Sequence, residues 1–120
     1  MLATLREDGS PRVSGTEVRF EDGQLTMGSM PGALKARDLR RDPRCALHAN
    51  PGDGTMRGGD AKIAGRAVEL PPAGDPPEQG PHMFLLDLSE AVLTSVAQGG
   101  GHLLIEVWRP GAGVKRIERR

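Results

Sequence analysis

The chain has 120 residues, a length typical of one domain, so we expect residues 1–120 to form a single domain. Its 16 basic residues balance its 16 acidic residues, which argues against a nucleic-acid partner, because general nucleic-acid binders carry a basic excess. No apolar run is long enough to span a membrane, and residues 1–6 do not start as a signal peptide does. A lone cysteine, Cys45, can form no internal disulfide, so we expect a cytoplasmic protein without a membrane partner.

The first thirty residues alternate short apolar runs with turn signals. Strands are predicted over 2–5, 11–20 and 24–29. The Asp-Gly pairs at 8–9 and 22–23 suit the positive dihedrals of tight hairpins. We therefore expect a three-stranded meander.

The spacing of apolar residues then changes to about three, which predicts one short helix over 33–41. Pro31 suits the start of a helix, where its missing N–H donor is not needed. Asp42-Pro43 ends the helix, because the residue before a proline is forced out of the helical region.

The second half returns to strand signals. Residues 51–59 and 71–81 are predicted loops, rich in Gly and in Pro respectively. Strands are predicted over 44–50, 60–70, 83–88, 91–97, 102–108 and 114–118, where the third and fourth could be one continuous strand bent at 89–90. Seven or eight short strands and one helix indicate a small antiparallel barrel or sandwich.

One stretch of this pattern favours anion binding. Ser29 ends a strand, and Lys35 lies near the first turn of the helix that follows. The free amide donors and positive dipole of a helix N-terminus attract a phosphate, which the lysine and hydroxyl would also hold. The alternative is a solvated helix with scattered arginines.

Four segments resemble one known family. They are LATLREDGSPRVS at 2–14, KARDLRRDPR at 35–44, GDAKIAGRA at 59–67, and the tail 102–120 with its Trp-Arg-Pro-Gly run. Over nearly its whole length the chain resembles the pyridoxamine 5'-phosphate oxidase-like flavin-binding split-barrel superfamily. The resemblance implies a mainly β fold, a six-stranded antiparallel split β-barrel (Greek key) with one or two short helices.

The resemblance also implies a function. Members form homodimers with two cofactor sites at the interface, and they bind FMN or the deazaflavin coenzyme F-420. It implies an oxidoreductase acting on a small-molecule substrate. A low hydrophobic fraction of 37% independently suggests that a partner subunit completes the core.

By motif position, the resemblance assigns the cofactor contacts. Lys35 would hold the phosphate, and Arg37 would contact the phosphate or the tail of a larger coenzyme. The remaining contacts would be Arg12, Val13 and Ser14 along the isoalloxazine edge, and backbone or hydroxyl groups of Thr26, Met27, Gly28 and Ser29.

The chain also departs from the family pattern. Ala33 and Leu34 stand where members often have a phosphate-binding arginine. Glu17 stands where the true oxidase has a lysine for the substrate phosphate, and an anion there argues against pyridoxamine 5'-phosphate as substrate. Members also usually carry a helix before the first strand, whereas this sequence begins at the strand.

Two alternatives stay open on the same fold. The first is a non-catalytic cofactor-binding or carrier protein, suggested by the missing arginine. The second is a haem binder that uses a histidine, although His48, His82 and His102 lack metal-ligand spacing and are expected to be structural or solvated. Cys45 is expected to be a buried thiol, and Trp108 a core or interface anchor.

Overall fold

The computed structural model describes residues 1–49, 58–71, 80–97 and 99–120. Most of the two predicted loops, over 50–57 and 72–79, therefore lies outside the described residues. The described residues form nine strands and one helix: β1 Leu2–Leu5, β2 Pro11–Ser14, β3 Glu17–Glu21, β4 Gln24–Ser29, α1 Leu34–Arg41, β5 Arg44–His48, β6 Asp60–Glu69, β7 His82–Val96, β8 Leu103–Arg109 and β9 Gly113–Arg119.

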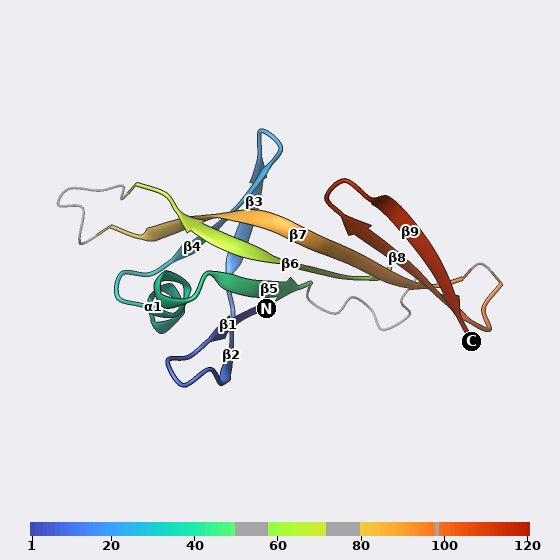
Figure 1. Cartoon of the computed structure of the whole chain (residues 1–120), viewed down its shortest axis with the longest axis horizontal. Helices are drawn as coiled ribbons and strands as arrows, with labels where there is room; N and C mark the ends of the chain where they lie inside the picture. Colours follow the sequence, from blue (N-terminus) through green and yellow to red (C-terminus); the bar gives the residue numbers. More distant parts are fainter. Residues whose placement is uncertain (50–57, 72–79, 98) are drawn as a thin grey trace.

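The strands form one antiparallel sheet that divides around its longest member, β7. The order is β2-β1-β5-β6-β7-β4-β3, with β8 paired to β7 and β9 to β8. One edge of β7 pairs with β6, while the other pairs with β4 near its start and with β8 near its end (Figure 1). The mainly β, antiparallel split-barrel prediction is confirmed, with nine strands rather than six.

Local signals placed most element ends correctly. The helix begins at Leu34 and ends at Arg41, with extended backbone at Asp42 as Pro43 requires. The turn after β3 has positive φ at Asp22 (52°) and Gly23 (76°), as the Asp-Gly signal predicted. The strand predicted over 11–20 is instead two strands, β2 and β3. They lie at opposite ends of the sheet order, so the predicted three-stranded meander is wrong.

A bulge explains how one strand spans 82–96. Ala64 pairs with Glu90 and Gly65 with Leu88, so Ser89 is the extra residue on β7. The Ser89 hydroxyl donates to the Ala64 carbonyl at 3.2 Å. A Cβ at Gly65 would lie 2.1 Å from the Asp87 carbonyl oxygen, so the close approach requires glycine. The continuous bent strand, one of the two sequence interpretations, is confirmed.

The core lies between α1 and the sheet. Its buried side chains are Leu2, Leu25, Met27, Ala36, Leu39, Cys45, Leu47, Ala67, Phe84 and Leu86. The prediction of a buried thiol is confirmed at Cys45, whose pKa is raised to about 11 by burial. Such a thiol packs as a small apolar group and is not poised as a nucleophile.

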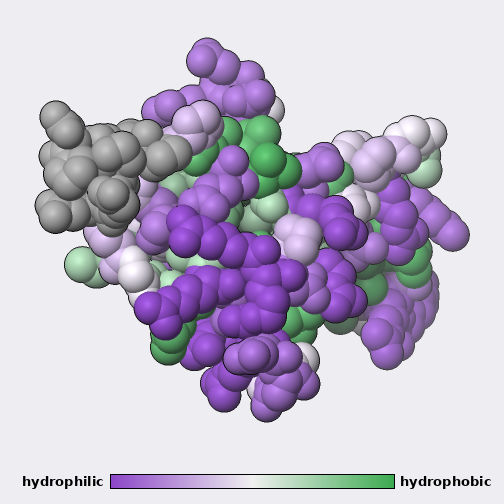
Figure 2. Space-filling view, turned by 60° about the vertical axis from the view of Figure 1, so that its left-hand side comes forward, coloured by the Kyte–Doolittle hydropathy of each residue, from purple (hydrophilic) through white to green (hydrophobic). Residues whose placement is uncertain are grey.

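The molecule is elongated, measuring 56 × 27 × 27 Å, with a radius of gyration of 16.4 Å. A compact chain of this length has about 14 Å. The β8–β9 hairpin extends from the far half of β7 (Figure 1), and the space-filling view shows apolar groups open to solvent among hydrophilic ones (Figure 2). Phe20 is 78% exposed, and Val18, Val96, Val114 and Ile117 are also exposed. Much apolar surface is thus exposed among the described residues.

Replacing Gly65 by Ala tests the bulge. We expect a loss of at least ~2 kcal/mol in unfolding free energy, because the new methyl group overlaps the Asp87 carbonyl and the backbones must separate. Chemical denaturation measures the loss. Gly58→Ala is the matched control, since its Cβ would meet nothing within 4 Å, and its effect should stay below ~0.5 kcal/mol. Equal stability of the two variants would contradict the close approach.

Candidate functional site

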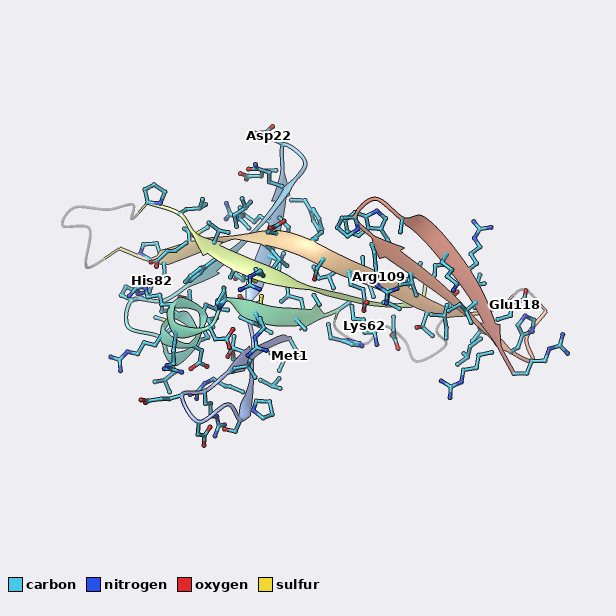
Figure 3. The ribbon with its side chains drawn as sticks, viewed as in Figure 1. Met1, Asp22, Lys62, His82, Arg109 and Glu118 are labelled. Carbon is cyan, nitrogen blue, oxygen red and sulfur yellow. The ribbon has the colours of Figure 1, made fainter. Side chains whose placement is uncertain are left out.

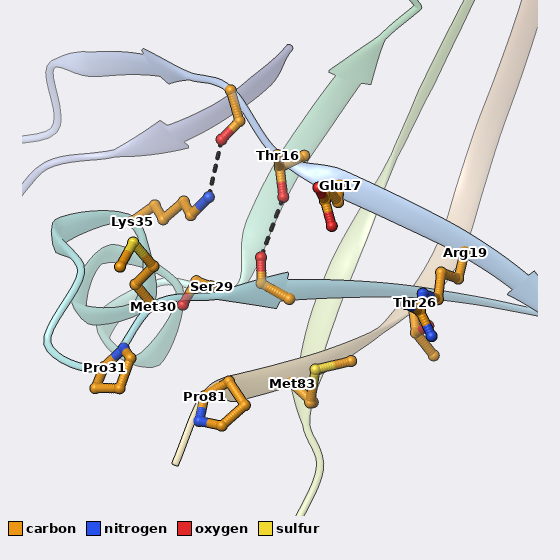
Figure 4. Close-up of a pocket in the computed structure, with 12 residues that line it drawn as sticks. Thr16, Glu17, Arg19, Thr26, Ser29, Met30, Pro31, Lys35, Pro81 and Met83 are labelled. Atoms are coloured by element: carbon orange, nitrogen blue, oxygen red, sulfur yellow. Dashed lines mark hydrogen bonds between the residues drawn. The ribbon is translucent and has the colours of Figure 1, made fainter. Parts of the chain in front are cut away.

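The main cavity, of about 690 Å³, lies over β3, β4 and the start of β7, beside the first turn of α1 (Figure 4). On β4, Leu25 and Met27 face the core, whereas Thr26 and Gly28 face the cavity. The register then places Glu17 opposite Gly28. The cavity therefore occupies the face of the sheet opposite the core.

The absence of a side chain at Gly28 opens the cavity floor. A Cβ there would lie 3.3 Å from the Met83 sulfur, so a side chain would crowd the thioether that borders the floor. Gly28 pairs with Met83 on the next strand, and the Thr16 hydroxyl donates to the Gly28 carbonyl at 3.4 Å. The floor is thus flat backbone with a polarisable sulfur at its edge, a surface that suits a planar ring.

Lys35 supplies positive charge at the helix end of the cavity. Its ammonium donates to the Gly15 carbonyl at 2.8 Å (Figure 4). The helix begins beside it with no side-chain cap at Ala33 and no acidic residue in its first turn. Free amide donors, an uncompensated dipole and an ammonium with further donors together make this end suitable for an anion.

Ser29 adds an unpaired hydroxyl at the same end. It lines the cavity and is 9% exposed. Among the described residues, its Oγ and that of Ser14 are the buried side-chain polar atoms without a hydrogen-bond partner. Because buried hydroxyls are normally paired, the Ser29 hydroxyl is a candidate ligand contact.

Arg12 is held in a buried ion pair. Its Nε donates to Asp38 Oδ2 at 2.7 Å, and Thr4 Oγ1 donates to the same oxygen at 2.7 Å. Arg41 lies 3.6 Å from the other carboxylate oxygen. Burial alone would raise the pKa of Asp38, but the hydrogen bonds from Thr4 and Arg12 outweigh it and hold that pKa below its usual value. Arg12 therefore docks α1 onto β1 and β2.

Arg12 and Arg37 line a second, open cavity of about 540 Å³ on the helix side of β2. Arg6 and Arg41 also line it, but so do Glu7 and Asp8. Its charge is therefore mixed.

The structure divides the sequence-predicted site residues into three groups. Lys35 and Ser29 line the main cavity, and Arg12 and Arg37 line the second. Val13, on β2, is 63% exposed and lines neither. The side chain of Met27 is 2% exposed in the core, so that only its backbone could contact a ligand. Ser14 is half-buried beside Gly15.

Several cavity residues were not among the predicted contacts. Gly15, Thr16, Arg19 and Met83 line it. Gly15 and Thr16 lie at the break between β2 and β3, which the sequence interpretation took as continuous strand. Met83 is brought in by pairing with β4. A glycine inside a predicted strand is the one local signal that pointed to the break.

The three histidines lie in different parts of the fold. Among the described residues no three His, Cys, Asp or Glu side chains lie together as a metal group would require. His48 is exposed on β5, and His102 lies 3.7 Å from Glu118 beside the hairpin. His82 contacts the backbone next to α1. In the described ranges, no helix is long and apolar enough to cross a membrane.

A comparison with protein families identifies the fold of this chain. The family described as "Pyridoxamine 5'-phosphate oxidase" matches residues 1–82, which include β1 to β6 and α1. The chain belongs to this family. The resemblance seen in the sequence is thus confirmed at the level of the superfamily.

Solved structures share this fold at low identity. A pyridoxamine 5'-phosphate oxidase-related, FMN-binding protein from Nostoc punctiforme PCC 73102 matches with a TM-score of 0.73 and 12% identity, over 99% of this chain and 85% of that one. PhzG from Burkholderia lata 383, in complex with tetrahydrophenazine-1-carboxylic acid, matches with a TM-score of 0.70 and 13% identity, over 99% of this chain and 80% of that one. An F420 reductase matches with a TM-score of 0.61 and 17% identity, over 75% of this chain and 85% of that one. At such identities the likeness shows the fold.

Replacing Asp38 by Asn tests the buried ion pair. We expect a loss of about 2 kcal/mol at pH 7, because Arg12 and Thr4 lose a charged acceptor. Since the folded pKa of Asp38 is lowered, its contribution is fully present above the unfolded value near 4 and is lost as pH falls further. Denaturation at pH 7 and pH 3 should show the wild type and variant converging. A constant difference would contradict this assignment.

Proposed function

We propose that this protein binds FMN or the deazaflavin coenzyme F-420 in the main cavity and is a cytoplasmic oxidoreductase acting on a small molecule. The observation that carries the proposal is Lys35, held by the Gly15 carbonyl at the open start of α1 and at one end of a flat cavity. Family membership and neighbours described as FMN-binding protein and F420 reductase support it.

The residues present fit a phosphate-bearing cofactor with a planar ring. Both cofactors have a phosphate that Lys35 would bind and Ser29 would pair with, which would satisfy the orphaned hydroxyl. The Gly28 floor would lie against the ring, with Met83 at its edge. A volume of about 690 Å³ is in the range of small-molecule and cofactor sites.

The bound cofactor would supply hydride transfer, so the protein needs to bind the cofactor, orient it and tune its electronic properties. Lys35, whose ammonium lies against the Gly15 carbonyl, would hold the anionic end of the cofactor beside the start of α1. Glu17 and Arg19 lie on the cavity side of β3, opposite Gly28 and Thr26 of β4. Glu17 disfavours a substrate phosphate at its position, which agrees with a substrate other than pyridoxamine 5'-phosphate.

The second cavity favours neither cofactor outright. Arg37 and the neighbouring arginines would hold the acidic tail of F-420, which FMN lacks. Glu7 and Asp8 beside them would weaken that attraction. A cofactor-binding protein without turnover remains the second candidate, because Leu34 occupies a position where an arginine would complete the phosphate site.

We further propose that two copies pair through the uncovered apolar surface and place the cofactor at their interface. Val18 and Phe20 lie on the core side of β3, opposite the buried Met27 and Leu25, yet among the described residues Val18 stays 39% and Phe20 78% exposed. The β8–β9 hairpin exposes Val114 and Ile117. Single apolar residues on a surface are common, but a strand whose inward face is bare indicates a missing partner.

Lys35→Ala should weaken cofactor binding at least tenfold, or ~1.4 kcal/mol, through loss of a charge-assisted phosphate contact. Fluorescence titration with FMN and, separately, with F-420 measures this. Lys62→Ala is the control, because Lys62 lies on β6 and does not line the cavity. Unchanged affinity in the Lys35 variant would refute the phosphate assignment. Binding of neither cofactor by the wild type would refute the proposed function.

Phe20→Glu tests the proposed pairing. Wild-type protein should sediment as a dimer at micromolar concentration, and a buried carboxylate in each copy should raise the dissociation constant at least tenfold. Because Phe20 is 78% exposed in the single chain, the variant should keep its unfolding free energy as a monomer. Sedimentation of the wild type as a monomer at every concentration would exclude the dimer.

A further inference from the structure

His82 joins three segments that are far apart in the sequence. It is the first residue of β7, lies beside α1 (Figure 3), and its side chain is 15% exposed. The Gly32 amide donates to its Nε2 at 3.2 Å. Its Nδ1 lies 2.9 Å from Arg40 Nη2 and 3.6 Å from Glu69 Oε1. One imidazole thus contacts the turn before α1, the helix itself and the end of β6.

The turn it contacts shapes the phosphate end of the cavity. Met30 and Pro31 line the cavity, and Gly32 follows with φ at 75°, a conformation that favours glycine. The Ala33 amide closes the turn by donating to the Met30 carbonyl at 3.1 Å. Within the described residues, the Gly32 amide has His82 as its acceptor. The imidazole therefore ties the turn to the sheet.

Arg40 and Glu69 lie on the other side of the ring. Arg40 donates twice to the Glu69 carboxylate, at 2.8 and 2.6 Å. The hydrogen bond from Arg40 lowers the pKa of Glu69, so the carboxylate stays charged beside Nδ1. Arg40 Nη2 can only donate and a neutral imidazole has one acceptor nitrogen, so Nδ1 and Nε2 cannot accept from Arg40 and from Gly32 at the same time. The Gly32 bond therefore requires the tautomer with the proton on Nδ1, in which Arg40 keeps the Glu69 carboxylate as its partner.

We propose that His82 is a positioning residue for cofactor binding: through Gly32 it holds the 30–32 turn, and with it the start of the helix that carries Lys35. This inference rests on the proposed function for its ligand, although the link between His82 and the turn does not. His82 would touch no reacting atom. It would lower the cost of ordering the site by holding it in the binding geometry before the ligand arrives.

Two substitutions at His82 distinguish the effect of losing the hydrogen-bond acceptor from the effect of losing the volume of the ring. In His82→Gln, the side-chain oxygen can accept from the Gly32 amide at nearly the reach of Nε2. His82→Leu fills similar volume and has no acceptor. His48→Leu is the control, because His48 is an exposed histidine on β5 that does not line the cavity. Hydrogen exchange at the Gly32 amide and the dissociation constant for FMN and for F-420 are measured on the full chain.

We expect His82→Leu to speed exchange at Gly32 and to raise the dissociation constant at least tenfold for whichever cofactor the wild type binds. His82→Gln should restore both within about threefold, and His48→Leu should change neither. If His82 only filled space, leucine would serve as well as glutamine, because both side chains fill a similar volume. If His82→Leu does not fold, His82→Asn serves instead, because its shorter side chain cannot reach Gly32.

Unchanged exchange and affinity in the leucine variant would overturn the inference, as would a glutamine variant as impaired as the leucine one. If the wild type binds neither cofactor, the proposed function fails and so does the assigned role in binding. The exchange rates would then still decide whether His82 holds the turn. Failure of the function and failure of the link to the turn are therefore distinguishable.

Discussion

The buried carboxylate of Asp38 is the contact on which the candidate site depends. Helix α1 has eight residues and buries only Ala36, Asp38 and Leu39, so apolar packing alone orients it weakly. Burying a carboxylate is unfavourable unless it is paired and hydrogen-bonded, and Asp38 is satisfied by Thr4 of β1 and Arg12 of β2. This requirement fixes the rotation of the helix. Lys35 lies one turn earlier, where its ammonium meets the Gly15 carbonyl just after β2.

The long strand β7 determines where a ligand could bind. Near its start it pairs with β4, which places Met83 beside Gly28 on the cavity side and Phe84 beside Met27 on the core side. Near its end it leaves β4 and pairs with β8. The bulge at Ser89 lets one strand make both pairings, and Gly65 lets the backbones approach there. The same alternation that buries the core thus leaves a bare backbone floor on the other face.

The sequence predicted what local chemistry controls. Proline at 43 ended the helix, and the Asp-Gly pair at 22–23 made a hairpin turn, because each effect acts within a few residues. Lys35 and Ser29 were placed at the cavity by their positions around the helix start. Contacts that depend on pairing across the sheet could not be predicted. Nothing near Asp38 in sequence indicated Arg12 as its partner, and nothing near Gly32 indicated His82.

The exposed apolar surface reflects the chain's low content of hydrophobic residues, and it lies on a strand that also borders the cavity. With 37% hydrophobic residues, the chain buries a small core beneath α1, and in the part that the structure describes it leaves Val18 and Phe20 exposed on the inward face of β3. That strand also carries Glu17 and Arg19 on its other face, at the cavity. A partner covering Phe20 would therefore immobilise the strand that forms one wall of the cavity. Pairing and ligand binding should then be coupled, so that a dimer-breaking substitution at Phe20 also weakens cofactor affinity without touching Lys35.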